Sequence, residues 1–281
     1  MNYYILPNWP APDNVKAYST TRHGGFSKPP YDSLNLSLAT GDREEIVLKN
    51  RQWLYQDLNL KKEPFWLKQE HTNLVVAIDQ NVAYKPIIAD ASFTKDTDCV
   101  CAILTADCIP ILVCNKQGTI VAAIHAGWKG IAKGIIEASI RALNTDPKNL
   151  LVWLGPAIGP NAFQVQQDVV TMFCQQLPAC QSAFIKNEDG YLGNIYQLAT
   201  IRLNKIGITN IYGGEFCTFS QNELFYSHRR DGEKSGRFTS LIWLTSLAQK
   251  DPTNFTFSSL DVSNNELPKI IRNKFTNLLF R

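Results

Sequence analysis

The chain of 281 residues contains only four histidines, little net charge and no run of about 18 uncharged apolar residues. The missing apolar run argues against a membrane span. Lys and Arg number 28 against 25 Asp and Glu, and they are scattered, which argues against a nucleic-acid-binding protein. No basic segment precedes the short apolar run in MNYYILPNWPAP, so we expect no secretion signal.

The seven cysteines form an odd set that lacks the spacing of a small secreted disulfide scaffold. Cys99 and Cys101 alternate within an apolar run, where cysteines commonly serve as small core residues. Without an export signal, this pattern favours free thiols and a cytoplasmic protein.

Apolar residues make up 44% of the chain, which is enough for a sizeable core. Apolar runs predict strands at 74–79, 100–108, 109–115, 119–125, 150–155 and 238–244, with strand-rich segments at 13–19 and 36–40. Apolar residues recur at helical spacing in four segments, which predicts helices at 43–58, 131–143, 169–177 and 195–206. Because strands and helices alternate without the regularity of a doubly wound sheet, we expect the α/β class, as a mixed α+β single domain with helices flanking mixed β-sheets.

We expect this domain to occupy residues 1–248 and a C-terminal extension to occupy residues 249–281. The extension is first polar and turn-rich, and apolar residues then recur at i, i+3 and i+4 spacing: Leu267, Ile270, Ile271, Phe275, Leu278 and Leu279. This spacing predicts an amphipathic helix. The sequence leaves open whether the helix docks on its own domain, binds a partner or lies on a membrane surface.

Three short segments carry a thiol and two imidazoles: KQEHTN with His71, TADCIP with Cys108 and AIHAGWKG with His125. This donor set suits Zn²⁺ better than Mg²⁺ or Ca²⁺. Cys108 and His125 end consecutive predicted strands, so they would lie side by side if those strands pair. Three protein ligands would leave one position for water or substrate, as in catalytic zinc sites. Each residue alone is more commonly a core or surface residue, and no CxxC or HExxH signature supports the set.

Further polar residues are candidates for catalysis or for anion binding. Asp107 and Asp90 could act as a general acid or base or could hold an imidazole N–H, and capping a turn is the alternative. The GWKG turn opens a predicted helix whose free N–H groups favour an anion, and Lys129 adds charge. Arg22 and Arg230 lie in predicted turns, where arginines are commonly solvated but could also bind phosphate.

Seven segments together resemble the bacterial YfiH/YlmD family between about Thr20 and Leu244: TTRHGGFSKPPYDSLNL, LKQEHTN, ILTADCIPIL, AAIHAGWKG, WLGPAIGPNAF, YLGNIYQLA and YSHRRDGEKSGR. Members have been described as multicopper polyphenol oxidases or laccase-like proteins, as purine nucleoside phosphorylases and as peptidoglycan editing factors. Lys129 departs from the family, which usually has Arg there. The resemblance implies a single α/β domain with mixed sheets, related to Cys–His deamidase toxins, and it implies nothing about the extension.

The resemblance also implies a function. It implies that His71, Cys108 and His125 bind zinc and that the site performs phosphorolysis of adenosine, inosine, guanosine and methylthioadenosine, with adenosine deamination. The expected partners are purine nucleosides and phosphate, bound by a monomer or homodimer. In this chemistry Cys108, His125, Asp107 and Asp90 are the catalytic candidates, and the candidates for binding phosphate or substrate are Arg22, Asn35, Lys129 and Arg230.

Other functions compete with this interpretation. A Cys–His hydrolase would use Cys108 as nucleophile and His125 as base on an amide, and the editing-factor name suggests a misincorporated amino acid in a cell-wall precursor. Multicopper oxidation needs clustered sites rich in imidazole, which four histidines cannot build beside a zinc centre, so copper is the less favoured metal. His23 and His228 lie in predicted turns and are expected to be exposed. A non-catalytic binding protein is the least favoured function.

Overall fold

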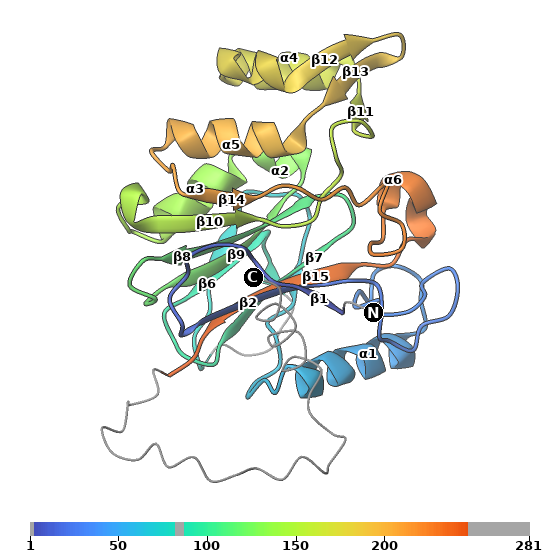
Figure 1. Cartoon of the computed structure of the whole chain (residues 1–281), viewed down its shortest axis with the longest axis vertical. Coiled ribbons are helices and arrows are strands. Elements are labelled where there is room, and N and C mark those ends of the chain that lie inside the picture. The colour runs from blue at the N-terminus through green and yellow to red at the C-terminus, as the bar shows by residue number, and fades with distance from the viewer. Residues whose placement is uncertain (1–2, 82–86, 247–281) are drawn as a thin grey trace, which may run out of the picture.

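The structure, a computed structural model, describes residues 3–81 and 87–246. Within these ranges it is a mixed α+β fold, in which two packed β-sheets have helices on their outer sides (Figure 1). The predicted C-terminal extension and its amphipathic helix lie outside the described residues.

The larger sheet, here the central sheet, has the strand order β14-β10-β8-β9-β6-β4. Its strands are β4 (Val75–Ala77), β6 (Ala91–Thr94), β8 (Ile109–Asn115), β9 (Val121–Ala126), β10 (Leu150–Leu154) and β14 (Ile211–Gly213). The β10–β14 and β4–β6 pairs are parallel, and the pairs between them are antiparallel, so the sheet is mixed as predicted.

The second sheet, here the outer sheet, has the order β1-β2-β15-β7 and is antiparallel. Its strands are β1 (Tyr4–Ile5), β2 (Val15–Thr20), β7 (Val100–Thr105) and β15 (Phe238–Leu244). β15 lies between β2 and β7, so one of the last described segments is a central strand of a sheet that begins near the N-terminus.

Alternation along β8 explains how the central sheet has a core on each face. Ile109, Ile111 and Val113 pack toward the helices, whereas Leu112 and Cys114 pack toward the outer sheet. A strand that is buried on both faces needs an uninterrupted apolar sequence, which IPILVCN provides. The strands predicted at 109–115 and 119–125 are confirmed.

Helices cover both outer sides of the sheet pair. The helix α1 (Glu44–Asp57) packs on the outer sheet, and α2 (Trp128–Ala132), α3 (Ile135–Ala142) and α5 (Ile195–Lys205) pack on the central sheet. Beyond α5, Figure 1 shows a further layer of α4 (Gln167–Gln176) with β11 (Gln164–Val165), β12 (Phe184–Asn187) and β13 (Gly190–Gly193). The remaining short elements are β3 (Leu67–Lys68), β5 (Ile87–Ile88), α6 (His228–Asp231) and the 3₁₀ turns Pro147–Asn149, Pro178–Ala183 and Gly232–Lys234.

Three local predictions differ from the structure. Residues 36–40 form no strand, because the buried Asn35 side chain donates to Ser37 O and Thr40 Oγ1 and holds a loop instead. The helix predicted over 131–143 is two helices, α2 and α3, separated at Gly134 with φ of 86°. β7 ends at Thr105, and Cys108 directly precedes β8.

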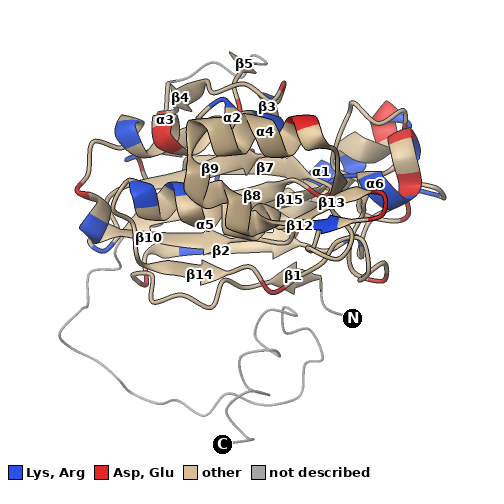
Figure 2. Cartoon of the chain, turned by 90° about the horizontal axis from the view of Figure 1, so that it is seen from above, with Lys and Arg blue, Asp and Glu red and all other residues tan. Residues whose placement is uncertain are grey.

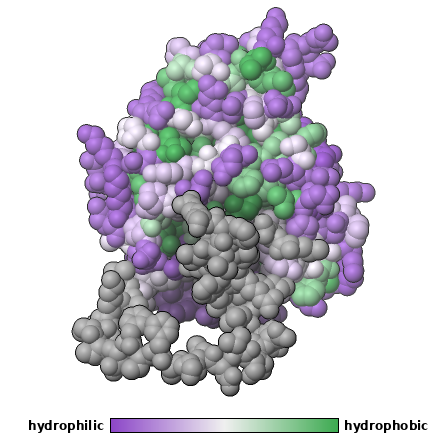
Figure 3. All heavy atoms as spheres, in the orientation of Figure 1, coloured by the Kyte–Doolittle hydropathy of each residue, from purple (hydrophilic) through white to green (hydrophobic). Residues whose placement is uncertain are grey.

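The surface mixes charges of both signs. Figure 2 shows Lys and Arg interspersed with Asp and Glu at both ends of the molecule, and the face in Figure 3 is mostly hydrophilic with smaller hydrophobic patches. Among the described helices, none has the length and apolar character needed to cross a membrane.

Candidate metal centre

The β8–β9 hairpin brings Cys108 and His125 together. In its antiparallel register Ile109 pairs with Ala126 and Pro110 with His125, so the start of β8 lies beside the end of β9. His71 joins them from the loop after β3. The ligand atoms of these three side chains lie within 4.8 Å of one another, and they form the one such His, Cys or acidic cluster among the described residues. The structure therefore assembles the set that the sequence proposes as metal ligands.

Asp90 connects the two imidazole-bearing segments. Its Oδ1 lies 2.7 Å from His125 Nδ1 and accepts from His71 N at 3.0 Å, while its Oδ2 accepts from Thr72 N and Thr72 Oγ1 at 2.6 and 2.7 Å. The side chain is fully buried. Burial alone would raise its pKa, but the hydrogen bonds from His125 and Thr72 lower the pKa well below the ordinary range. Asp90 is therefore an ionised carboxylate that holds His125 and the His71 turn.

The two imidazoles have opposite protonation preferences. Burial, followed by the neighbouring His125, lowers the pKa of His71 to about 4, so its ring is neutral near pH 7. Burial opposes charge on His125, but the charge of Cys108 and the hydrogen bond to Asp90 raise its pKa to about 9. Because His125 Nδ1 faces Asp90, Nε2 is the atom left for a metal, and metal binding would release a proton.

Two local features fit a bound zinc ion. His71 Nδ1 is buried and has no hydrogen-bond partner among the described residues, so a ring nitrogen remains to be satisfied. A Cβ built on Gly127 would lie 2.6 Å from the His71 ring and 2.8 Å from Cys108 Sγ. Only glycine leaves these two side chains space at this position, and the thiolate and imidazole donors match zinc chemistry.

The cluster lies in a cavity of about 640 Å³. Its walls come from the 37–40 loop, the 66–71 segment and the end of β7, and further lining side chains are Arg51, His228 and Arg237. Sequence reasoning missed Arg51, Arg237 and the aromatic Trp66. Arg51 lies on the predicted helix 43–58 and Arg237 next to a predicted strand, and neither segment contains one of the metal-ligand motifs.

Arg237 is a half-buried cation without a carboxylate ion pair among the described residues. Its Nη1 donates only to the carbonyls of Ser235 and Gly236, at 2.7 and 2.9 Å. Burial lowers its pKa, whereas the charges of Cys108 and Asp107 oppose that shift. A partly desolvated guanidinium favours a negative partner, so this wall of the cavity suits an anionic ligand.

Arg51 and Asn35 contribute to the same wall. The Arg51 guanidinium lies 4.2 Å from the centroid of the Trp66 ring and donates from Nε to Leu36 O, and burial lowers its pKa to about 10. Asn35, proposed from the sequence as a binding residue, is fully buried and accepts from Arg237 N at 2.9 Å. It therefore supports the Arg237 segment from behind the cavity.

The other residues proposed from the sequence lie outside the described lining of this cavity. Arg22 donates to Asp32 O and Asn222 O, and Arg230 donates to three loop carbonyls and to Asp231. Lys129 is exposed beside Trp128. Both Asp107 oxygens accept hydrogen bonds, from Thr218 Oγ1 and Arg229 N, each at 2.6 Å. Their catalytic and binding roles stay predictions.

His228, expected to be exposed, begins α6 and is exposed at the edge of the cavity.

Fold and site define a mixed α+β protein with a candidate His–Cys–His metal centre at the end of a buried β-hairpin. Residues 16–245 match the family described as multi-copper polyphenol oxidoreductase laccase. The chain belongs to this family, whose members include YfiH and YlmD, as its motifs predicted.

This chain aligns with nearly the full length of several relatives. The protein named purine nucleoside phosphorylase YfiH of Escherichia coli (strain K12) is 46% identical over 244 residues, which are 87% of this chain and 100% of that protein. The crystal structure of Neisseria meningitidis protein NMB0706 has a TM-score of 0.82 at 40% identity, covering 86% of this chain and 99% of its own. YlmD from Geobacillus stearothermophilus has a TM-score of 0.80 at 29% identity, covering 86% and 96%.

Proposed function

We propose that this protein is a zinc-dependent purine nucleoside phosphorylase that also deaminates adenosine. One observation carries the proposal: a candidate three-ligand metal cluster and the half-buried Arg237 guanidinium, which has no carboxylate partner among the described residues, line the same cavity. Relatives named purine nucleoside phosphorylase support the reaction class. The proposed substrates are adenosine, inosine, guanosine and methylthioadenosine, each with phosphate for the phosphorolysis.

In phosphorolysis, phosphate must be held against the anomeric carbon of the ribose while the purine leaves. Arg237 and Arg51 would hold the phosphate, because guanidinium forks match its oxygens and the partly buried setting strengthens the attraction. The Trp66 ring offers a flat apolar surface for a purine. A zinc ion on His71, Cys108 and His125 would supply Lewis acidity at an open coordination position.

Proton transfer to the leaving purine or to ammonia needs a titratable group that faces the cavity. Glu70 and His228 line it, whereas both oxygens of Asp90 and of Asp107 already accept hydrogen bonds. We therefore assign Asp90 to positioning the ligands, and Glu70 and His228 to proton transfer.

The test is phosphate-dependent release of hypoxanthine from inosine by pure protein, together with ammonia release from adenosine. Cys108→Ala and His125→Ala should each lower turnover more than about 100-fold. Arg237→Ala should mainly raise KM for phosphate, and Arg43→Ala, at an exposed ion pair with Glu45, is the matched control. If the Cys108 and His125 variants turn over substrate as fast as the unaltered protein, the activity comes from a contaminating enzyme and the assignment is wrong.

A Cys–His amide hydrolase is the second candidate, because Cys108 and His125 interact directly and this contact helps to raise the pKa of His125. Its proposed substrate is a peptidoglycan precursor with a misincorporated amino acid. Alkylation separates the two functions: a metal-free nucleophile reacts with iodoacetamide at Cys108, whereas a zinc-held thiolate is protected until a chelator is added.

The small number of histidines argues against copper oxidase activity. The sequence has four histidines, and two of them belong to the proposed zinc set. Full copper occupancy of reconstituted protein, with turnover of a phenol, would reverse this conclusion.

A further inference from the structure

Asp107 directly precedes Cys108 and lies in a strained turn beside the candidate metal cluster. The cavity lined by His71, Cys108 and His125 is here called the metal cavity. The Asp107 backbone is in the left-handed region, with φ of 91°. A residue with a side chain is uncommon in that region and stays there only when its surroundings hold it. The turn that presents Cys108 therefore depends on the contacts of Asp107.

Every oxygen of Asp107 accepts a hydrogen bond from a different segment of the chain. The main-chain carbonyl accepts from Ile158 N at 3.0 Å, Oδ1 from Thr218 Oγ1 at 2.6 Å and Oδ2 from Arg229 N at 2.6 Å. Thr218 is itself fully buried, so this donor has a fixed position. Asp107 thus joins the Cys108 turn to three segments that are distant in the sequence.

One of these hydrogen bonds holds α6, which carries His228 at the edge of the metal cavity. A helix of four residues is not stable alone, and its free N–H groups need caps. Ser227 Oγ accepts from Arg230 N, and the Asp107 carboxylate accepts from Arg229 N. The first cap is local, whereas the second comes from the turn of a candidate metal ligand.

α6 keeps another attachment when the Asp107 cap is removed. The Arg229 guanidinium donates to Ala162 O and Gln164 O at 3.3 and 2.9 Å, and it lies 5.7 Å from the centroid of the Phe163 ring. These contacts join α6 to the start of β11 and not to the metal cluster. Loss of the Asp107 cap should therefore loosen α6 relative to the cluster without detaching it from the protein.

We propose that Asp107 is a positioning residue that couples the Cys108 turn to α6 and so keeps His228 in place beside the metal cluster. It acts through these two elements and transfers no proton, since both carboxylate oxygens are engaged. The link to proton transfer by His228 rests on the proposed function, whereas the coupling between the turn and α6 does not. Because a metal ion on Cys108 would fix the turn, zinc binding and α6 docking should favour each other.

Amide hydrogen exchange of Arg229, followed by NMR, tests the coupling. Asp107→Asn keeps a side chain that tolerates the left-handed region but removes the charged acceptor, so in metal-free protein the Arg229 amide should exchange about tenfold faster. Saturating zinc should slow this exchange about fivefold in the unaltered protein and leave it unchanged in Asp107→Asn. Equal metal-free exchange in the two proteins, or the same slowing by bound zinc in both, would overturn the proposal.

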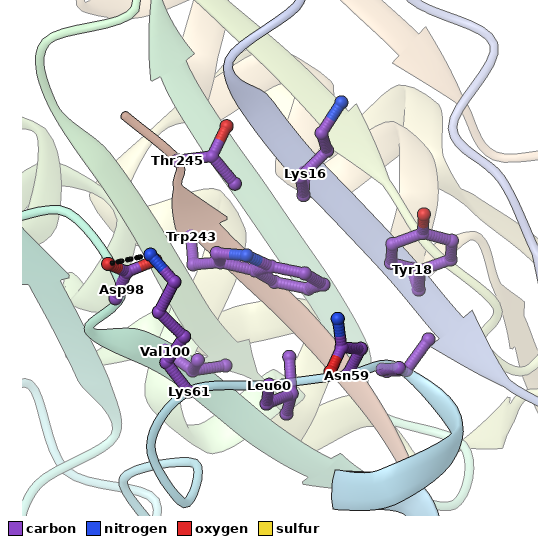
Figure 4. Close-up of a pocket in the computed structure, with 10 residues that line it drawn as sticks. Lys16, Tyr18, Asn59, Leu60, Lys61, Asp98, Val100, Trp243 and Thr245 are labelled. Atoms are coloured by element: carbon purple, nitrogen blue, oxygen red, sulfur yellow. Dashed lines mark hydrogen bonds and ion pairs between the residues drawn. The ribbon is translucent and has the colours of Figure 1, made fainter. Parts of the chain in front are cut away.

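Asp98 provides a matched control, because it precedes β7 whereas Asp107 follows it. Asp98 is also left-handed, with φ of 63°, and its Oδ2 accepts from Lys61 Nζ at 3.0 Å (Figure 4). It lines a separate pocket on the outer sheet, which shares no described lining residue with the metal cavity. Asp98→Asn should therefore leave Arg229 exchange unchanged. Faster Arg229 exchange in Asp98→Asn, equal to that in Asp107→Asn, would refute a specific role of Asp107.

Thr218→Val separates positioning from proton transfer, since it removes one donor to Asp107 and leaves the carboxylate in place. We expect Arg229 exchange to rise about threefold and kcat for inosine phosphorolysis to fall about threefold, against a fall of about tenfold in Asp107→Asn. A kcat loss confined to Asp107→Asn, with unchanged Arg229 exchange, would make Asp107 a proton-transfer group and contradict the proposal. If the unaltered protein neither binds zinc nor performs phosphorolysis, the proposed function fails, and metal-free Arg229 exchange still decides the coupling.

Discussion

At the residue scale, Gly127 shows how closely the backbone approaches His71 and Cys108, two of the candidate metal ligands. We expect Gly127→Ala to weaken zinc affinity by about 10–100-fold, because the added methyl group would lie 2.6 Å from the His71 ring. Competition with a chromophoric chelator measures this affinity. Gly130→Ala is the matched control: its methyl group would meet the nearest atom at 3.4 Å, and alanine favours the α2 helix by about 1 kcal/mol. Wild-type zinc affinity in Gly127→Ala would mean that zinc binds elsewhere.

Asp90 is expected to control zinc affinity indirectly, by positioning His125 and the His71 turn. Asp90→Asn removes the charged acceptor of His125 and Thr72, so we expect zinc affinity to fall by about 10–100-fold and the free energy of unfolding by about 3 kcal/mol. Chelator competition and urea denaturation give the two values. Asp168→Asn, at an exposed position of α4, should change stability by less than about 0.5 kcal/mol. If Asp90→Asn and Asp168→Asn have the same zinc affinity and the same free energy of unfolding, the hydrogen bonds of Asp90 do not stabilise the site.

The three residues of the candidate metal cluster could be proposed from the sequence, whereas the charged wall of the cavity could not. Cys108 directly precedes one apolar strand and His125 lies near the end of the next, and the short connection between these strands favours a hairpin. Arg51 lies on α1 and Arg237 directly precedes β15, and the packing of α1 on the outer sheet brings them to one cavity. Such long-range contacts leave no periodic signal in either segment.

At the element scale, α5 is held on α3 by a buried ion pair. Arg202 Nη1 lies 3.1 Å from Glu137 Oε1, with side-chain exposures of 7% and 18%. We expect Arg202→Ala to lower the free energy of unfolding by about 3 kcal/mol, because Glu137 would remain as an unpaired, largely buried charge. Urea denaturation measures the loss. Arg43→Ala breaks an ion pair at 74% and 63% exposure and should cost less than about 0.5 kcal/mol. Equal losses would show that the α3–α5 contact depends on apolar packing alone.

Strands and helices with strong apolar patterns were predicted well, and errors arose where side chains compete with the backbone. The helix predicted at 43–58 is confirmed by α1, and the strand at 238–244 by β15. The 36–40 segment has an alternating pattern, yet Asn35 and Thr40 hydrogen bonds hold it as a loop. Neither the β15 position between β2 and β7 nor the sheet order follows from local pattern, because those pairings join distant parts of the chain.

At the scale of the whole molecule, we propose that the catalytic domain ends at residue 248 and that its activity does not need the C-terminal extension, residues 249–281. We expect a chain truncated after residue 248 to keep phosphorolysis within about twofold of the full chain, since the family match ends at residue 245. Steady-state kinetics test this expectation, and loss of activity on truncation would contradict the boundary.

The central place of β15 in the outer sheet also determines the order of events during synthesis. Ser19 and Ser240, which hydrogen-bond across β2 and β15, are 221 residues apart. At typical elongation rates, β2 waits roughly 10–40 s for its neighbour to leave the ribosome. During that time β2 and β7 expose unpaired edges that invite aggregation. The nascent chain should therefore depend on chaperones until β15 inserts, and that same insertion brings Arg237 to the cavity.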